Sequence, residues 1–394
     1  MKVKIFSTIL LLVFVLKINA DGIKYATVKV GAEKTDVYLP KLAGKTVAVV
    51  GNQTSMIGKT HLVDSLMSLN VNIVKIFAPE HGFRGFADAG ESIKDGKDTK
   101  TGLSVISLYG KHKKPTVDDL KDVDIVVFDI QDVGARFYTY ISTLQYVMEA
   151  CAENNKEIIV LDRPNPNGYF VDGPVLKKEF KSFIGMQPVP IAYGMSIGEY
   201  AKMINEEGWL KNGEKCKLDV VTCDGWDHTK FYKLPVKPSP NLPNMVSVFY
   251  YPTLCLLEGT VMSVGRGTDA PFQLVGHPDL ADGYVEFTPK SMPGAKHPKF
   301  EGVKCKGYDA RDNGIEYIVE KKGLGIPCLE KAYANVGGGD EFFTKSFNYL
   351  AGNKEFKEQI KFRMQESEIK ATWKKDIDAF KKIRKKYLLY KDFE

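Results

Sequence analysis

The residues best suited to chemistry follow three predicted strands in the first half of the chain. Glu80 and His81 come directly after the apolar run 71–78, and further polar loops follow the runs 124–128 and 157–161. Because open α/β sheets bind ligands at the carboxyl ends of their strands, we expect the three loops to share one edge of a sheet. They contain the candidate residues His81, Arg84, Glu91, Asp129, Gln131, Asp132, Arg136, Tyr138, Arg163 and Asn165.

This mixture of side chains suits a polyhydroxylated substrate, because amides bind hydroxyl groups, aromatic rings stack on sugar faces and arginines hold anionic substituents. Glycosidic bonds are usually cleaved by a carboxylic acid that protonates the leaving oxygen and a second group that stabilises or attacks the developing cation. We predict Glu80 as the acid, because partial burial after a strand favours a protonated carboxyl group. Glu91, Asp129 and Asp132 are candidates for the second group, and the sequence does not decide between retention and inversion.

A competing motif lies at residues 194–198, where Gly-Met-Ser-Ile-Gly matches the nucleophile elbow of serine hydrolases. Ser196 and Glu199 also form the Ser-x-x-Glu pattern of a helix capping box. The preceding run 188–193 contains two prolines and makes a poor central strand. We therefore favour the cap, and keep a secreted serine esterase or deacylase with Ser196 as nucleophile as the alternative function. A cell-wall binding module without turnover is a third interpretation.

The sequence does not contain a complete motif for binding a nucleotide or a metal. The segment Gly58-Lys59-Thr60 resembles part of a phosphate-binding loop, but position 53 is Gln where that loop needs Gly, and no GxGxxG follows a predicted strand. The six histidines include no pair at the i, i+4 spacing of a helical zinc site. We therefore expect no metal and no other cofactor. The six cysteines include no CxxC pair, and the sequence leaves open whether they form disulfides.

An alternation of strands and helices must position these loops. Predicted strands cover 46–50, 71–78, 104–108, 124–129 and 157–162, and predicted helices cover 61–69, 117–121 and 136–153. Continuous apolar runs suit a parallel sheet covered on both faces, so we expect an α/β fold with a Rossmann-like, doubly wound sheet.

The chain of 394 residues exceeds what one hydrophobic core usually organises. We predict a catalytic domain at 21–245 and a smaller α+β domain at 246–394, with the proline-rich segment 235–243 as the connection. A final helix should bury Trp373, Ile377, Phe380 and Tyr387 along one side.

Residues 1–20 have the layout of a cleavable secretory signal, with Lys2 and Lys4 before a short apolar run and Ala20 at the end. That run is too short to span a bilayer, which takes about 20 residues. We expect a periplasmic or secreted protein without a membrane span after cleavage. Removing Lys2, Lys4 and Lys17 lowers the net charge from +6 to 6 − 3 = +3, which gives no reason to propose a nucleic-acid partner. The oligomeric state is left open.

Five segments resemble the family of exo-acting β-N-acetylmuramidases. This resemblance implies release of N-acetylmuramic acid from the non-reducing ends of peptidoglycan fragments, that is, muropeptides or disaccharides. It also implies a Rossmann-like domain, a smaller second domain, and an active site in the cleft between them. It places the family's catalytic glutamate at Glu80 and adds Asn241, Glu258 and Arg266 as substrate-binding candidates. The segments are 78–85 (APEHGFRG), 128–140 (FDIQDVGARFYTY), 161–167 (LDRPNPN), 238–243 (PSPNLP) and 258–268 (EGTVMSVGRGT).

The resemblance bears on two open questions. The lactyl carboxylate of muramic acid gives a reason for arginines at the site, and the sequence does not choose between Arg84, Arg136, Arg163 and Arg266. The stretch 193–199 resembles the family's usual HGMTIGE, with Tyr193 for His and Ser196 for Thr. A Thr at that place suits a helix cap, so the resemblance weakens the esterase interpretation.

Overall fold

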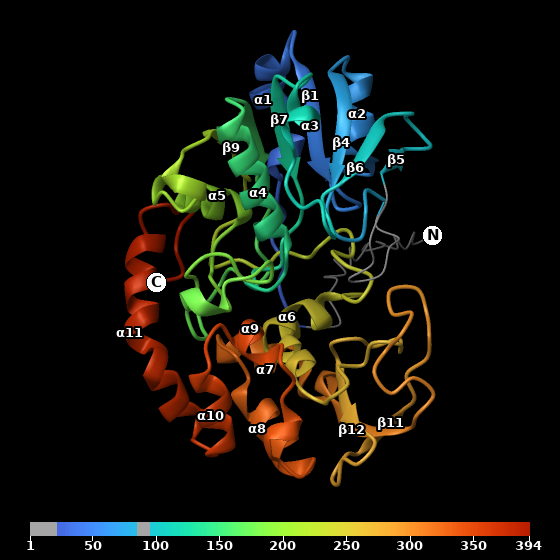
Figure 1. The fold of residues 1–394 in the computed structure, drawn as a ribbon, viewed down its shortest axis with the longest axis vertical. Coiled ribbons are helices and arrows are strands. Elements are labelled where there is room, and N and C mark those ends of the chain that lie inside the picture. Colours follow the sequence, from blue (N-terminus) through green and yellow to red (C-terminus); the bar gives the residue numbers. More distant parts are fainter. Residues whose placement is uncertain (1–21, 85–94) are drawn as a thin grey trace, which may run out of the picture.

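The computed structural model describes residues 22–84 and 95–394, so the predicted signal segment 1–20 lies outside the described residues. A larger domain around a seven-stranded sheet lies above a smaller domain in Figure 1. The order of the strands in the sheet is β5-β6-β4-β1-β7-β8-β9. The strands are β1 (Thr46–Gly51), β4 (Asn72–Ala78), β5 (Gly96–Lys97), β6 (Ser104–Ser107), β7 (Ile125–Asp129), β8 (Glu157–Leu161) and β9 (Lys217–Val221).

The large sheet is wound in both directions from its central strand β1. The chain adds β4 and β6 on one side of β1 and then β7, β8 and β9 on the other, with parallel pairing throughout. Only the short edge strand β5 is antiparallel to its neighbour. The winding direction changes between β1 and β7, and such a switch point is where open α/β sheets bind ligands. The predicted Rossmann-like fold class is confirmed.

Helices cover both faces of this sheet. In β1, Val47 and Val49 belong to the core formed with α1 and α2, whereas Ala48 and Val50 belong to the core formed with α4 and α5. Because both faces are buried, the central strands are continuous apolar runs, which is why the sequence predicts them well. The helices of this domain are α1 (Thr35–Leu42), α2 (Leu62–Ser68), α3 (Val117–Leu120), α4 (Tyr140–Glu153) and α5 (Ile197–Glu206), and a small hairpin pairs β2 (Met56–Ile57) with β3 (Thr60–His61).

The structure differs from the predicted elements at the short strands β2, β3 and β5, at β9 and at the start of α4, of which the last two bear on the sheet and the site. Strand β9 was not predicted, because it is a partly exposed edge strand whose Lys217 and Asp219 interrupt the apolar pattern. The helix predicted from residue 136 begins only at Tyr140. The backbone N–H of Arg136 donates instead to the carbonyl of Ile191 at 2.8 Å, so the loop before α4 is held to another segment and is not free to continue the helix.

The smaller domain is α+β, as predicted. Its antiparallel sheet has the order β10-β12-β11, and its last helix, α11, buries the predicted residues Trp373, Ile377 and Phe380, whereas Tyr387 lies beyond the end of the helix. The elements of this domain are α6 (Met245–Leu254), β10 (Leu274–His277), β11 (Val285–Phe287), β12 (Cys305–Asp309), α7 (Gly314–Lys321), α8 (Ile326–Asn335), α9 (Phe347–Ala351), α10 (Glu355–Lys361) and α11 (Glu366–Arg384).

The chain after α11 returns to the large domain, and Figure 1 shows the C-terminus beside it. The Tyr390 hydroxyl donates to Asp162 Oδ2 at 2.6 Å, and the backbone N–H of His228 donates to the carbonyl of Lys391 at 3.0 Å. The buried Arg384 donates from Nε to the carbonyl of Gly194 at 2.8 Å. These contacts fasten the last residues of the chain to the helix α5 region of the first domain.

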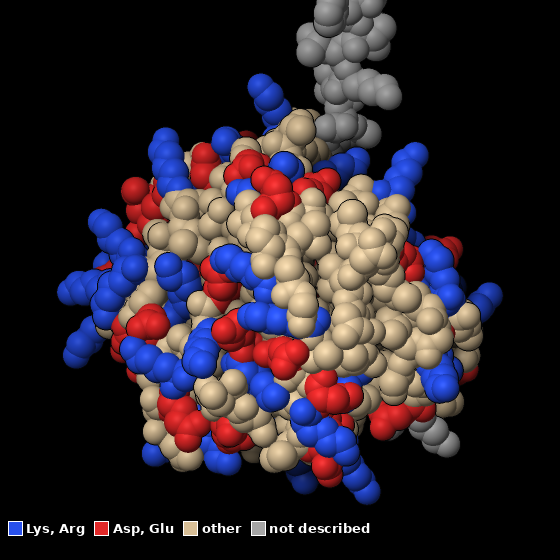
Figure 2. Space-filling model, turned by 90° about the horizontal axis from the view of Figure 1, so that it is seen from above, with Lys and Arg blue, Asp and Glu red and all other residues tan. Residues whose placement is uncertain are grey.

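Several further features bear on the expectations from sequence. All six cysteines are free thiols. Within the described ranges, no helix is long and apolar enough to cross a membrane, and no cluster of His, Cys, Asp or Glu could hold a metal ion. Figure 2 shows basic and acidic side chains interspersed on the face seen from above, without a broad region of one sign.

Candidate active site

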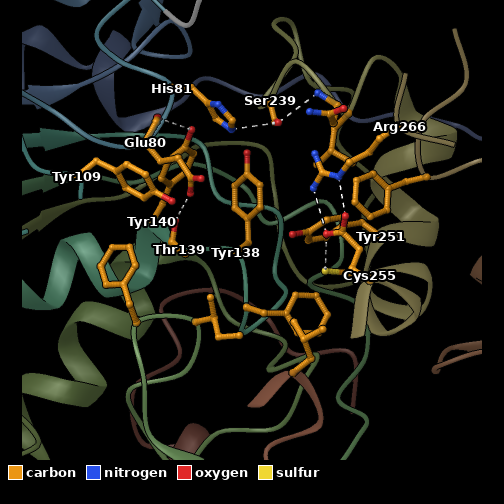
Figure 3. Close-up of a pocket in the computed structure, with 18 residues that line it drawn as sticks. Glu80, His81, Tyr109, Tyr138, Thr139, Tyr140, Ser239, Tyr251, Cys255 and Arg266 are labelled. Carbon is orange, nitrogen blue, oxygen red and sulfur yellow. Dashed lines mark hydrogen bonds and ion pairs between the residues drawn. The ribbon is translucent and has the colours of Figure 1, made fainter. Parts of the chain in front are cut away.

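A pocket of about 190 Å³ lies between the carboxyl ends of the central strands and the smaller domain. Glu80 and His81 reach it from the loop after β4, Tyr109 from the loop after β6, and Tyr138 and Thr139 from the segment between β7 and α4. The smaller domain contributes side chains from α6 and the segments after it (Figure 3). The polar residues that line the pocket are Glu80, His81, Tyr109, Tyr138, Thr139, Tyr140, Ser239, Asn241, Tyr251, Cys255, Glu258 and Arg266.

The carboxylate of Glu80 is held by hydroxyl groups on one wall of this pocket. Thr139 Oγ1 donates to Glu80 Oε2 at 2.9 Å, and the Tyr140 hydroxyl lies 3.5 Å from the Glu80 carbonyl oxygen. Burial, the charge of Glu80 and a hydrogen bond to it raise the pKa of Tyr109, so the Tyr109 hydroxyl stays protonated as a donor. The side chain of Glu80 is only partly buried, so it remains accessible to a ligand.

The side chains of Glu80 and His81 point in different directions, because the chain makes a tight turn after β4. The backbone of His81 has a φ of 71°, a left-handed conformation that a non-glycine residue rarely adopts. Figure 3 shows the His81 ring directed toward Ser239, and His81 Nε2 lies 3.2 Å from Ser239 Oγ. The Ser239 oxygen also accepts from the backbone N–H of Asn241 at 3.2 Å. The turn thus joins the Glu80 loop to the proline-rich segment.

The opposite wall carries Arg266, which comes from the smaller domain (Figure 3). Arg266 Nε and Nη2 donate to the two carboxylate oxygens of Glu258 at 2.5 and 3.0 Å. Its guanidinium also lies over the Phe272 ring, 4.9 Å from the centroid. Burial alone would lower the pKa of Arg266, but the Glu258 carboxylate outweighs it and raises the pKa. Nη1 of Arg266 is buried and has no hydrogen-bond partner among the described residues, so one donor group of the guanidinium is left unsatisfied there.

Tyr138 stands between the two walls in Figure 3. Its hydroxyl donates to the Pro238 carbonyl at 2.8 Å, and its ring packs edge-to-face against Tyr140 and Tyr251, with centroids 4.8 and 5.6 Å away. Burial raises the pKa of Tyr138 well above the ordinary tyrosine value, so the hydroxyl stays neutral. The proline-rich segment, predicted both as a connection between domains and as the source of the substrate-binding candidate Asn241, is therefore part of the pocket.

Six predicted site residues line the pocket, namely Glu80, His81, Tyr138, Asn241, Glu258 and Arg266. Glu91 lies outside the described residues. The remaining predicted residues lie elsewhere in the fold.

Two predicted arginines are bound to carboxylates away from the pocket. Arg163 forms a buried two-point ion pair with Asp129, with nitrogen to oxygen distances of 2.5 and 2.8 Å. Arg84 forms a similar pair with Asp98 at 3.0 and 2.8 Å. Because these guanidinium groups already match carboxylates on two atoms, they are structural links in this fold, and neither lines the pocket.

Arg136, Gln131 and Asn165 are also buried away from the pocket. Arg136 donates to four backbone carbonyls at 2.7 to 2.9 Å, two of them from Leu350 and Ala351 in the smaller domain. Burial lowers the pKa of Arg136 to about 9. Gln131 Nε2 donates to the carbonyls of Asp132 and Pro164 at 2.7 and 2.8 Å, and Asn165 Nδ2 donates to the Met195 carbonyl at 2.8 Å. These side chains hold loops together.

Asp132 turns into the core, where Tyr193 and the backbone N–H of Gly134 donate to its Oδ2. Burial raises the pKa of Asp132 to about 7. It does not line the pocket, so none of the three candidates for the second catalytic group is a described lining residue. In the described lining, the only carboxylates are Glu80 and Glu258, and Glu258 is paired with Arg266.

Ser196 is the N-cap of α5. Its Oγ accepts from the backbone N–H of Glu199 at 3.2 Å, and its own N–H donates to Glu199 Oε2 at 2.8 Å, which completes the predicted capping box. Ser196 Oγ donates to Asp162 Oδ2 at 2.7 Å, and the residue is completely buried. Since no substrate can reach Ser196, the structure does not support it as a nucleophile.

Sequence reasoning missed several lining residues, among them Tyr109, Thr139 and Ser239. Tyr109 follows the predicted strand 104–108, so the rule that selected Glu80 would also have selected it. Thr139 lies in the segment mistaken for the first turn of a helix. Ser239 could be predicted only by knowing which loop the proline-rich segment approaches in the folded protein. No local sequence pattern indicates this.

Comparison with known proteins agrees with this architecture. Residues 47–246 and 249–390 match the family models described as exo-β-N-acetylmuramidase NamZ, N-terminal and C-terminal. The peptidoglycan β-N-acetylmuramidase NamZ of Bacillus subtilis (strain 168) is 39% identical, over 90% of this chain and 89% of that protein.

Two crystal structures of DUF1343 family proteins from Bacteroides fragilis NCTC 9343 are similar. One has a TM-score of 0.87 and 45% identity, covering 93% of this chain and 99% of that chain. The other has a TM-score of 0.75 and 32% identity, covering 92% and 99%. The chain therefore belongs to the NamZ family of exo-β-N-acetylmuramidases.

Proposed function

We propose that this protein is a glycoside hydrolase that removes terminal, non-reducing N-acetylmuramic acid from peptidoglycan fragments. The observation that carries the proposal is the pocket itself, in which the accessible carboxyl group of Glu80 faces a wall that holds Arg266. A volume of about 190 Å³ is below the range of about 300 to 1,000 Å³ for pockets that enclose drug-sized ligands. Such a pocket suits a single terminal sugar better than the interior of a glycan chain.

Glu80 acts in this proposal as the general acid. It gives its proton to the oxygen of the scissile bond while the bond from that oxygen to the anomeric carbon breaks. A water molecule adds to the anomeric carbon and gives a proton to the solvent, from which Glu80 is reprotonated, so one water is consumed and the products are free N-acetylmuramic acid and the shortened fragment. The hydroxyl groups of Thr139 and Tyr109 keep the carboxyl group directed into the pocket.

Arg266 is the arginine that we assign to the lactyl carboxylate of the substrate. Arg84, Arg136 and Arg163 do not line the pocket, whereas Arg266 does. Arg266 also binds a carboxylate on two atoms, but its Nη1 has no hydrogen-bond partner among the described residues. The ion pair with Glu258 fixes the guanidinium plane, so that binding costs little side-chain entropy.

Export is a further part of the proposal. The basic, apolar and small-residue order of residues 1–20 supports secretion into the periplasm or out of the cell, where peptidoglycan fragments occur. Mass spectrometry of the N-terminus of the protein from its natural source checks this, and an intact Met1 on the mature protein would contradict it.

Chromogenic glycosides test the activity. The protein should release the chromophore from a β-N-acetylmuramic acid glycoside and act at least tenfold less well on the N-acetylglucosamine glycoside, which lacks the lactyl group. Glu80→Gln should lower kcat by a factor of about 10² to 10⁴, the usual contribution of a general acid, without unfolding the protein. Arg266→Met should raise KM for the muramic acid glycoside selectively.

Matched controls separate these effects from damage to the fold. Asp118→Asn, at a side chain that is 91% exposed on α3, should behave as the parent protein. Full activity of Glu80→Gln, with the parent protein active, would remove Glu80 from the mechanism. Equal turnover of both glycosides would remove Arg266 from substrate recognition.

A further inference from the structure

A second pocket in the smaller domain lies apart from the candidate active site. It has a volume of about 300 Å³, larger than the pocket around Glu80. The two pockets use different faces of α6, because Tyr251 lines the first, whereas Tyr250, Thr253 and Leu254 line the second. The other walls of the second pocket come from β12, α7 and α8 (Figure 1). We infer that this pocket binds an uncharged N-acetylhexosamine unit of a glycan chain.

Four tyrosine rings give the second pocket an aromatic lining. Tyr284 and Tyr317 are 60% and 48% exposed, so both rings are accessible from the solvent. The Tyr250 hydroxyl donates to the Gly314 carbonyl at 2.9 Å, and the Tyr284 hydroxyl donates to the Asp309 carbonyl at 3.2 Å. Because these two hydrogen bonds hold the Tyr250 and Tyr284 rings in place, a ligand can contact them at little cost in side-chain entropy.

The charged groups of this pocket are compensated by their neighbours. Its charged lining residues are Asp309 and Lys331. Asp309 accepts from Arg311 Nε at 2.8 and 2.9 Å, and Lys331 Nζ lies 3.5 Å from Asp282 and 4.0 Å from the centroid of the Tyr308 ring. Among the described residues, both charged lining groups therefore have partners of opposite charge, whereas Nη1 of Arg266 in the first pocket has no hydrogen-bond partner.

An uncharged sugar matches this combination. The CH groups on one face of a pyranose ring stack on aromatic side chains, and its hydroxyl and acetamido groups can bond with the polar groups of Thr253 and Asn313 in the lining. The choice of a glycan built from N-acetylhexosamines rests on the proposed function, whereas the preference for a neutral sugar rests on the pocket alone. A second attachment point would keep the enzyme on a glycan between turnover events by raising the local concentration of chain ends.

Binding of an uncharged probe tests the inference directly. The probe is the β-1,4-linked trimer of N-acetylglucosamine, titrated calorimetrically into full-length Glu80→Gln protein, which prevents turnover. Adding Tyr284→Ala and Tyr317→Ala together should weaken binding at least tenfold. Tyr284→Phe with Tyr317→Phe, which keeps the ring faces, should bind within about threefold of the parent. Tyr349→Ala is the matched control, because Tyr349 is 43% exposed on α9 and outside the pocket.

The outcomes separate this inference from the proposed function. With otherwise native Glu80, the double alanine variant should cleave the chromogenic muramic acid glycoside at the parent rate, which also shows that it folds, but should release less sugar from polymeric glycan. Absence of trimer binding, or trimer binding that the tyrosine substitutions leave unchanged, would overturn the second site. Failure of the parent protein to cleave the chromogenic glycoside would contradict the proposed function. The binding experiment alone would then test the second site.

Discussion

The pocket around Glu80 and a buried network around Glu199 contain the same kinds of side chain. Both combine a glutamate, a histidine, a serine and tyrosine hydroxyls. In the network, His228 Nε2 lies 3.0 and 3.1 Å from the Glu199 carboxylate oxygens, and Tyr390 and Ser196 both donate to Asp162. Judged by residue types alone, the network would be a stronger candidate for an active site than the pocket. The reason is that the network includes Ser196, which lies in the apparent nucleophile elbow.

Access and hydrogen-bond satisfaction separate the two regions. Glu199 is completely buried, accepts from the backbone N–H groups of Ser196 and Leu389, and shares a hydrogen bond with His228. Glu80 is partly exposed in a cavity, and Arg266 in the same cavity keeps a nitrogen without a partner among the described residues. A constellation of reactive residues thus becomes a candidate site only where some bonding capacity is left for a ligand.

The largest effect in the network should come from Glu199→Ala. This change leaves the backbone N–H groups of Ser196 and Leu389 and the His228 ring without their acceptor, and each unsatisfied buried donor costs about 1–3 kcal/mol. We expect the free energy of unfolding, measured with urea, to fall by roughly 3–5 kcal/mol. Glu206→Ala, at a half-exposed position of the same helix, should change it by less than about 0.5 kcal/mol. A normal stability with lost turnover would show that the network takes part in catalysis.

Asp132→Asn should change how stability depends on pH. Burial raises the pKa of Asp132 from 3.8 to about 7 in the folded protein, so its contribution is fully present below about pH 4 and is lost as the pH rises through 7. The neutral Asn does not titrate, so the variant should gain roughly 2–3 kcal/mol relative to the parent between pH 5 and pH 8. Urea unfolding at both pH values measures this, with the exposed Asp118→Asn as control. A difference that does not vary with pH would contradict the burial of an ionisable carboxyl group.

Thr139→Val tests the positioning of Glu80. The substitution keeps the shape of the side chain and removes the hydrogen bond to Glu80 Oε2. We expect kcat for the chromogenic glycoside to fall about tenfold, equivalent to about 1.4 kcal/mol, with little change in KM. Thr143→Val, one turn further along α4, removes a hydroxyl that bonds only to the Thr139 carbonyl, and should leave kcat unchanged. If both variants lose activity equally, packing of α4 and not the orientation of Glu80 is responsible.

Ser196→Ala should have the smallest effect. Loss of an N-cap side chain costs about 1 kcal/mol of stability, and Ser196 lies outside the pocket. Turnover per folded molecule should stay at the parent value, and a serine-directed phosphonate should not inactivate the parent protein. Inactivation by that reagent at Ser196 would restore the esterase interpretation.

Features that depend on local pattern were predictable. Strands β1, β4, β6, β7 and β8 were predicted because each contains a run rich in Val, Ile, Leu or Phe, whereas the partly exposed edge strand β9 was not predicted. The capping box at Ser196 was found because it involves residues only three positions apart. The side chains that line the pocket were harder to predict, because a loop after a strand can turn its polar residues either toward the pocket or into the core.

Contacts with residues far away in the sequence decide whether these loop side chains face the pocket or the core. Arg136 is bound by carbonyls more than 200 positions away, Arg163 by Asp129, and Asp132 by Tyr193. None of these partners can be read from the residues next to each side chain. Of the four candidate arginines, Arg266 is the one that lines the described pocket.

The amino-acid sequence by itself determined the doubly wound sheet and the position of Glu80 at the end of a central strand, because strand burial and chain order follow from local composition. Only the tertiary structure decided that Arg266, Ser239 and Tyr138 meet Glu80 at one pocket and that Ser196 does not. The physical reason is that a buried polar group must find its partner wherever the folded chain supplies one, and in this protein those partners come from segments far apart in the sequence.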